Sequence, residues 1–130
     1  MCLLDTVVAW SEDTIDCLAT SHLDPANPLR SDGRLAPVCG IEYALQAAAV
    51  HGALQGGEVQ KPGYVASLRM SALTAERLDD PALGMLRAQA VREHADGRGL
   101  IYSIRLATED GRTLLEGRAT IMLHSLAVPA

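Results

Sequence analysis

Residues 40–54, with the sequence GIEYALQAAAVHGAL, decide the fold of this chain. The run of alanines favours a helix, because alanine has the highest helix propensity of the amino acids. Gly52 and the pair Gly56-Gly57 predict where the helix ends, since glycine is the residue that most often terminates one. Few positions within the helix are polar, so we expect it to be buried on nearly all sides.

Segments with strand character lie on both sides of this helix. Before it, residues 2–10 and 14–21 are rich in aliphatic and β-branched residues, which predicts a hairpin around the turn Ser11-Glu12-Asp13. After it, four segments are interpreted as strands and expected to form an antiparallel meander: residues 64–75, 84–95, 100–108 and 112–124. The dipeptide Asp110-Gly111 is a typical hairpin turn within that meander.

This order of elements predicts one α+β domain over residues 1–130. A long apolar helix needs cover on several sides, and a curved antiparallel sheet of five to six strands that wraps this central helix supplies it. The connection between the hairpin and the helix, residues 22–38 (HLDPANPLRSDGRLAPV), contains three prolines. A connection of this length inside a compact domain is usually functional.

The composition excludes several classes of function. The net charge is −5 and Lys61 is the one lysine among 11 basic residues, so neither a nucleic-acid footprint nor a membrane-binding basic patch is expected. The three cysteines have no paired spacing, which argues against a disulfide scaffold and against a metal site. The N-terminus lacks a signal peptide and no segment is long enough to span a bilayer, so we expect a cytoplasmic protein.

Several motifs resemble those of the hotdog-fold 3-hydroxyacyl-acyl-carrier-protein dehydratases. Residues 37–46 (PVCGIEYALQ) resemble the Pro-Gly-…-Glu-Ala-x-Ala-Gln segment of that family, and residues 1–7 (MCLLDTV) resemble its first strand. The dehydratase-like subgroup of aryl polyene biosynthesis is closer still. Further segments of the chain resemble that subgroup: Ser21-His22, NPLR at 27–30, DGR at 32–34, His51-Gly52 and GRAT at 117–120.

The resemblance implies a hotdog fold and the dehydration of a 3-hydroxyacyl thioester in fatty-acid or aryl-polyene-type biosynthesis. It also implies that the substrate arrives on the phosphopantetheine arm of an acyl carrier protein, with no other cofactor. In that chemistry a histidine removes the C2 proton, and a carboxyl group from the partner subunit protonates the leaving hydroxyl. Glu42 matches the carboxyl residue, and the N–H groups of Cys39 and Gly40 would polarise the thioester carbonyl.

The histidine of the family has no match at the expected place. In the family this histidine lies a few residues before the Pro-Gly pair. The matching region of this chain is Ser31-Asp32-Gly33-Arg34, which contains no histidine. The upstream candidate is His22, 20 residues before Glu42 (42 − 22 = 20). His22 is therefore the candidate base, and a loop histidine bonded to the backbone is the alternative interpretation.

The remaining site candidates each have a structural alternative. Gln46 lies one helical turn after Glu42 and would hold its carboxyl group or bond a backbone group. Arg30 and Arg34 would bind the phosphate of the phosphopantetheine arm or the acidic surface of a carrier protein. Ion pairs with Asp24 and Asp32 are the alternative for these two arginines. His51 falls on the opposite helix face from Glu42 and is interpreted as structural.

Three hypotheses about function follow from these residues. The first is a dehydratase that acts on carrier-bound 3-hydroxyacyl chains through Glu42 and His22. The second is a non-catalytic subunit that pairs with an active hotdog homologue, because the usual histidine is missing. The third is an acyl thioesterase, since a carboxylate on the helix also serves thioester hydrolysis. In each case we expect a homodimer or a heterodimer with another hotdog subunit, and a site at the interface.

Overall fold

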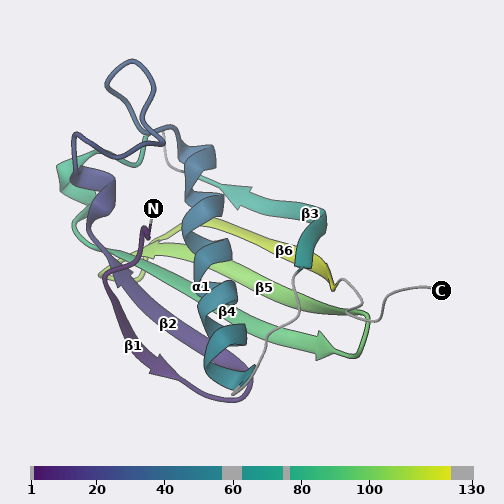
Figure 1. Ribbon diagram of the computed structural model, residues 1–130. Helices are drawn as coiled ribbons and strands as arrows, with labels where there is room; N and C mark the ends of the chain where they lie inside the picture. Colours follow the sequence, from purple (N-terminus) through teal and green to yellow (C-terminus); the bar gives the residue numbers. More distant parts are fainter. Residues whose placement is uncertain (1, 57–62, 75–76, 124–130) are drawn as a thin grey trace.

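The computed structural model describes residues 2–56, 63–74 and 77–123, and it places one α-helix against a six-stranded antiparallel sheet (Figure 1). The helix is α1 (Gly40–Gly56). The strands are β1 (Thr6–Trp10), β2 (Thr14–Ala19), β3 (Gly63–Leu73), β4 (Leu86–Ala95), β5 (Gly99–Thr108) and β6 (Thr113–Leu123). Three short 3-10 turns complete the described elements: η1 (Ser21–Leu23), η2 (Pro37–Cys39) and η3 (Pro81–Leu83). The predicted fold class is confirmed, and each predicted helix and strand is found. β1 begins at Thr6 and not at residue 2, and β2 ends at Ala19 and not at residue 21. Positions 57, 75 and 124 lie outside the described residues.

The order of the strands in the sheet is β1-β2-β4-β5-β6-β3, and all neighbours are antiparallel. The prediction of a meander through all four late strands is therefore wrong for β3, which pairs with β6 and not with β4. Tight turns join β4 to β5 and β5 to β6, so these strands must be neighbours. The connection from β3 to β4 is longer, includes η3 and passes from the edge strand to an interior position beyond β6 and β5.

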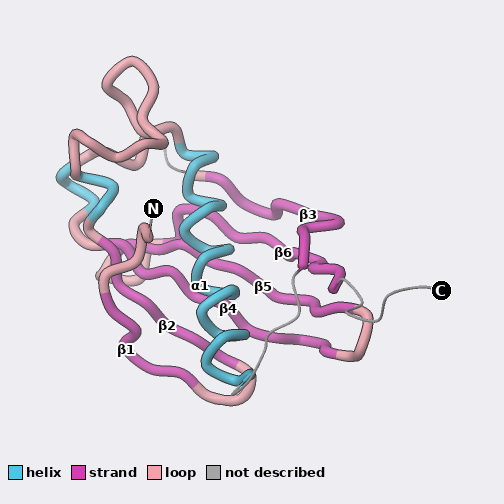
Figure 2. The backbone as a smooth tube through the Cα atoms, viewed as in Figure 1, coloured by secondary structure: helices cyan, strands magenta, loops and turns pink. Residues whose placement is uncertain are grey.

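The core lies between α1 and the strands β2, β4 and β5 (Figure 2). In β2, the first half of β4 and the middle of β5, every second side chain is buried, and these side chains define the inner face of the sheet. The helix buries small side chains against this face, so its backbone comes close to the sheet. A Cβ atom on Gly40 would lie 2.6 Å from Leu115 Cδ2 and 2.8 Å from Leu106 Cδ2, so a glycine is needed where the helix begins.

Part of the inner face and one side of the helix stay uncovered. Glu42, Ala49 and Ala53 form an exposed stripe along α1, so burial on nearly all sides is not found in the single chain. Beyond the helix, the aliphatic side chains of Val65, Met70 and Leu73 on β3 are exposed. Their partners on β6 include the core residue Leu115, so these side chains belong to the inner face. The fold thus leaves an apolar half-sheet open beside the first turns of the helix.

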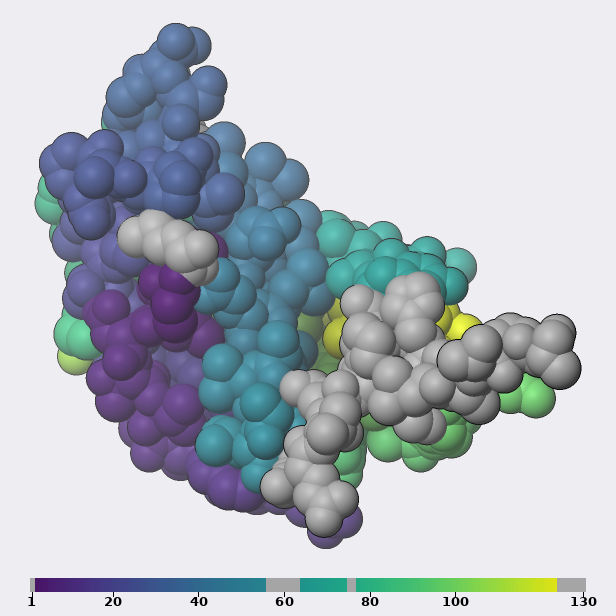
Figure 3. Space-filling model, viewed as in Figure 1, coloured from purple at the N-terminus to yellow at the C-terminus, as the bar shows by residue number. Residues whose placement is uncertain are grey.

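The long connection before the helix is ordered by turns and projects past the start of α1 as a separate lobe (Figure 3). At its tip, Ser31 and Arg34 form a two-residue hairpin through reciprocal backbone hydrogen bonds of 2.8 and 3.0 Å. Asp32 and Gly33 have φ angles of 53° and 74°, the left-handed pair of a type I′ turn. Asp and Gly adopt this conformation readily, which explains the sequence of the tip.

None of the described helices has the length and apolar character needed to cross a bilayer.

Candidate functional site

Glu42 lies in the first turn of α1 on the exposed stripe of the helix. No hydrogen bond or ion pair with the described residues engages its carboxyl group. The positive end of the helix dipole favours the carboxylate form at this position. Glu42 is therefore exposed in the first turn of the helix, on the face opposite the buried residues that pack against the sheet.

His22 has a different environment, because η1 buries it completely. Its Nε2 atom lies 2.7 Å from the carbonyl oxygen of Gly84, and since a carbonyl can only accept, Nε2 carries the proton. Nδ1 is buried and has no hydrogen-bond partner among the described residues. Burial lowers the pKa of His22, as does the Arg30 cation, although the bond to Gly84 opposes this shift. His22 is therefore a neutral, enclosed imidazole, and no bond joins it to Glu42.

Arg30 organises the connection between β2 and α1. Its guanidinium group donates to three backbone carbonyls, at 2.8 Å to Asp24, 3.2 Å to Gly33 and 3.0 Å to His22. It also pairs with the Asp79 carboxylate at 3.4 Å. The side chain is 15 % exposed, so its donors are largely committed to the loop itself. Among the two alternatives for Arg30, this arrangement favours a structural role, with Asp79 as its ionic partner in place of Asp24.

Asp79 connects the loop to the segment before β4. Its carboxylate accepts hydrogen bonds from the Leu35 backbone N–H at 3.0 Å and from Arg77 Nε at 2.9 Å, in addition to Arg30. The hydrogen bond from Arg77 is the main reason that the pKa of Asp79 lies well below its usual range. The carboxylate is almost fully buried and is neutralised by two arginines, so it fixes the position of the loop relative to the sheet.

Arg34 is exposed at the tip of the hairpin, and its side chain forms no hydrogen bond or ion pair with the described residues. The alternative pairing with Asp32 is not found. Of the two arginines predicted to bind phosphate, Arg34 is the one with a free guanidinium group within the described part of the chain.

The N–H groups predicted to polarise a thioester carbonyl are used within η2. The Cys39 N–H donates to the Ala36 carbonyl at 3.0 Å, and the Gly40 N–H donates to the carbonyls of Pro37 and Val38. They are not free in this structure, contrary to the expectation from sequence. A ligand carbonyl at this end of the helix would have to displace these internal bonds.

Gln46 takes the second of its two predicted roles, because its Oε1 atom accepts a hydrogen bond of 2.8 Å from the Leu3 backbone N–H. This bond ties the segment before β1 to the middle of the helix. Gln46 thus holds the N-terminal segment beside the site.

A polar cluster that the sequence reasoning missed supports the first turns of the helix. The buried Tyr43 hydroxyl lies 2.8 Å from Ser21 Oγ and accepts from Asn27 Nδ2 at 3.0 Å. Asn27 Nδ2 also donates to the Ser21 carbonyl at 2.9 Å. A tyrosine within an apolar helix needs a partner for its hydroxyl group when buried, and this rule was the available signal. The cluster fixes the loop against the helix.

His51 lies at the other end of α1 and is buried, as its structural interpretation requires. Nε2 donates to the Ser11 carbonyl at 2.9 Å, and Nδ1 accepts from the Tyr102 hydroxyl at 2.7 Å. These bonds link the end of the helix to the β1–β2 turn and to β5.

A hollow of about 500 Å³ lies on the outer face of the sheet, which is the side away from α1. Its lining includes Thr14, Gln89, Arg105 and Glu116, and it contains none of the predicted site residues. Within the described part of the chain, no three metal-ligating side chains come together. The candidate site therefore consists of Glu42, the start of α1 and the loop before it.

Comparison with solved structures supports this fold. The dehydratase heterocomplex ApeI:P from Xenorhabdus doucetiae is similar with a TM-score of 0.80 and 20% identity, over 95% of this chain and 84% of that chain. AziG from S. sahachiroi is similar with a TM-score of 0.68 and 16% identity, over 93% and 91% of the two chains. A hypothetical thioesterase from Streptococcus pneumoniae, solved with coenzyme A, has a TM-score of 0.67 and 12% identity over 92% and 85%.

No curated protein matches the chain. A family model described as ApeP-like, ApeP dehydratase, matches residues 1–126. That range contains the helix with Glu42, the loop with His22 and all six strands. The chain therefore has the hotdog fold and belongs to the ApeP dehydratase family.

Proposed function

We propose that this protein is a subunit of a hotdog dehydratase that acts on 3-hydroxyacyl thioesters carried by an acyl carrier protein, and that Glu42 is its acid. The observation that carries the proposal is the exposed position of Glu42 in the first turn of α1, in a chain whose strand β3 also leaves apolar side chains uncovered. A carboxyl group at this place becomes enclosed only when a second subunit covers the half-sheet.

The reaction removes a proton from C2 and the hydroxyl group from C3, so that a double bond forms and water leaves. The Glu42 carboxyl group would give its proton to the departing hydroxyl, which makes the leaving group water. Enclosure by a partner would remove water from around this carboxyl group, and burial favours the neutral form that can donate a proton. The phosphopantetheine arm of the substrate would pass Arg34, whose guanidinium group is available for its phosphate.

The base has two possible sources, and the burial of His22 favours one of them. An imidazole that is fully buried, and whose protonated nitrogen is bound to Gly84, does not reach a substrate beside the exposed Glu42 without a rearrangement of η1. We therefore infer that the partner subunit supplies the base, and that this chain supplies the acid. This arrangement combines the first two hypotheses, because the chain alone would be inactive and the complex active.

The heterocomplex described for the structural neighbour supports a mixed assembly, since that protein is a dehydratase built from two different subunits. An edge strand of 11 residues, β3, is available to a second sheet. The exposed side chains Val65, Met70 and Leu73 would be buried by the helix of a partner.

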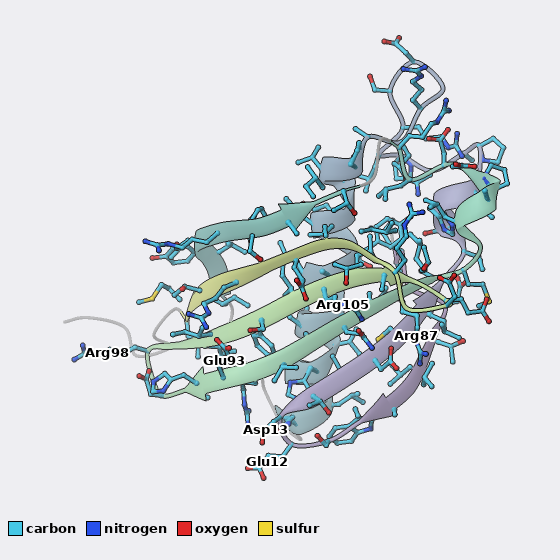
Figure 4. The ribbon with its side chains drawn as sticks, turned by 180° about the vertical axis from the view of Figure 1, so that it is seen from behind. Glu12, Asp13, Arg87, Glu93, Arg98 and Arg105 are labelled. Atoms are coloured by element: carbon cyan, nitrogen blue, oxygen red, sulfur yellow. The ribbon has the colours of Figure 1, made fainter. Side chains whose placement is uncertain are left out.

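The experiment compares the protein alone and mixed with an active hotdog dehydratase subunit, using a 3-hydroxyacyl carrier protein as substrate and mass spectrometry of the enoyl product. We expect turnover only in the mixture, and a loss of at least about 100-fold for Glu42→Gln. Glu12→Gln is the matched control, because Glu12 is exposed on the β1–β2 turn (Figure 4). Full turnover by the Glu42→Gln mixture contradicts the role of Glu42.

Thioester hydrolysis is distinguished in the same assay. Release of free acid in place of enoyl product would assign the chain to the thioesterases. The likeness to thioesterases concerns the fold alone at 12% identity, so dehydration is the function we propose.

A further inference from the structure

A row of charged and polar side chains crosses the outer face of the sheet and ends at the free edge of β3. From β4 to β3 the row contains Glu93, Ser103, Arg118 and Arg69, one from each strand. Arg118 lies directly opposite Ser103 on one side and directly opposite Arg69 on the other. Figure 4 shows the outer face from which Glu93 projects.

The charges in this row do not balance. Arg118 binds Glu93 through an ion pair, with Nε at 2.8 Å from Oε2, and through a hydrogen bond of 3.2 Å from Nη2 to Oε1. Ser103 also donates to Glu93, at 2.8 Å. Arg69 has no hydrogen bond or ion pair with any described residue, and its nearest cross-strand neighbour is a second arginine. Like charges placed directly opposite each other on adjacent strands are destabilising.

The strand that carries Arg69 is an edge of the sheet. β3 is the last strand in the order, and its other long side has no partner among the described residues. It is 11 residues long, most of its side chains are exposed, and its inner face carries the apolar side chains of the open half-sheet. A long edge with an apolar face is a template for a further strand.

Symmetry restricts how a second copy of the chain could use this edge. Two identical sheets that join along β3 with their inner faces on the same side are related by a two-fold axis perpendicular to the sheet. Outer-face residues then oppose only outer-face residues. Arg69 lies near the middle of Gly63–Leu73, so a pairing in which the two strands overlap along their full length brings the two copies of Arg69 opposite or diagonal to each other, with Cβ atoms about 5 to 8 Å apart.

A homodimer would consequently place four arginines side by side, two copies of Arg69 flanked by two copies of Arg118. We propose that the β3 edge pairs with a hotdog subunit of different sequence, whose facing strand carries an Asp or Glu opposite Arg69, and that Arg69 disfavours pairing of identical chains. This inference rests on the proposed role of the chain as one subunit of a complex. The inference adds to that role a feature that selects the partner, namely charge complementarity between Arg69 and the residue that faces it.

The test uses the protein itself as the probe. Arg69→Glu supplies the acidic side chain that the partner is expected to carry. Wild type and Arg69→Glu are mixed in equal amounts, one of them labelled with ¹⁵N, and native mass spectrometry counts the three kinds of dimer. If pairing were random, half of the dimers would be mixed. Random pairing gives equal numbers of mixed and identical dimers. At low salt we expect the ratio of mixed to identical dimers to be about fivefold higher than this random value. In 1 M NaCl the ratio should fall toward the random value, because salt screens the charges.

Arg98→Glu is the matched control, because Arg98 is an exposed arginine on the β4–β5 turn, outside both edge strands (Figure 4). When Arg98→Glu is mixed with wild type, half of the dimers should be mixed, as random pairing predicts. A random share for Arg69→Glu, or the absence of dimers from that mixture, overturns the proposal. No substrate is involved, so failure here leaves the acid role of Glu42 standing, and failure of the dehydration assay leaves this result unaffected.

Discussion

His22 Nε2 donates a hydrogen bond of 2.7 Å to the carbonyl oxygen of Gly84, and this bond joins the turn after β2 to the segment that leads into β4. The two residues are 62 positions apart in the chain. Because the imidazole is completely enclosed, the bond contributes to the position of the loop that precedes the helix.

His22→Ala should reduce the free energy of unfolding by about 2 to 4 kcal/mol, since it removes a buried hydrogen bond and leaves a cavity. Urea unfolding followed by circular dichroism measures this change. His94→Ala is the control, because His94 is an exposed histidine, and it should change the stability by less than about 0.5 kcal/mol. A His22→Ala protein as stable as wild type would show that the enclosed imidazole contributes nothing.

The stability should also depend on pH through His22. Burial lowers the pKa of His22 in the folded protein from its ordinary value of 6.5, which the unfolded chain retains. Between the two pKa values the unfolded state binds more protons, so stability is complete above pH 6.5 and falls as the pH decreases below it. Unfolding curves at several pH values from 7.5 downward should show this loss, and His22→Gln should make it smaller. An equal slope in both proteins would contradict the assignment.

Asp79→Asn should loosen the loop before the helix. The substitution removes the negative charge between Arg30 and Arg77 while retaining the shape of the side chain, and a buried cation is then left uncompensated. We expect a loss of about 2 kcal/mol or more and faster hydrogen exchange at the Leu35 amide, which donates to Asp79. Asp32→Asn is the control, because Asp32 is exposed and asparagine tolerates its positive φ.

Gly117→Ala should separate β3 from β6. A Cβ atom at this position would lie 2.6 Å from the backbone carbonyl oxygen of Arg69, and backbone atoms cannot move aside as side chains do. We expect a loss of about 1 to 3 kcal/mol, measured as a lower midpoint of thermal unfolding. Gly97→Ala serves as comparison, because nothing lies within 4 Å of its Cβ position. Equal effects of the two substitutions would show that β3 adjusts freely.

The cysteines should differ in reactivity. Cys17 is fully buried, and burial raises its thiol pKa to about 11, whereas Cys2 is exposed. At pH 8 a thiol-specific reagent should therefore modify Cys2 in the native protein and reach Cys17 only after unfolding. Counting modified thiols by mass spectrometry, with Cys2→Ser as the reference, tests this. Rapid native modification of Cys17 would contradict the burial.

The fold was largely predictable from local patterns. The alanine-rich run at 40–54 and the alternating strands such as 100–108 specify their own conformation, because helix propensity and a period of two residues act locally. The position of β3 was not predictable in this way. Whether it joins β4 or β6 depends on a crossing connection that no local signal describes.

The candidate site was predictable only in part. Glu42 and its place at the helix start follow from the motif, but the partners of Gln46, Arg30 and His22 do not. Each of these side chains bonds a residue distant in sequence, Leu3 at 43 positions, Asp79 at 49 and Gly84 at 62. Pairings of that kind depend on the assembled fold.

The exposed part of the sheet has a consequence for the chain before it is assembled into the proposed complex. A newly made chain presents one unpaired strand edge and exposed aliphatic side chains, the features that chaperones and proteases recognise. In the complex we propose, the abundance of this chain would follow the synthesis of its partner subunit, and surplus copies would aggregate or be degraded. Balanced production of both polypeptides would be a requirement set by the architecture itself.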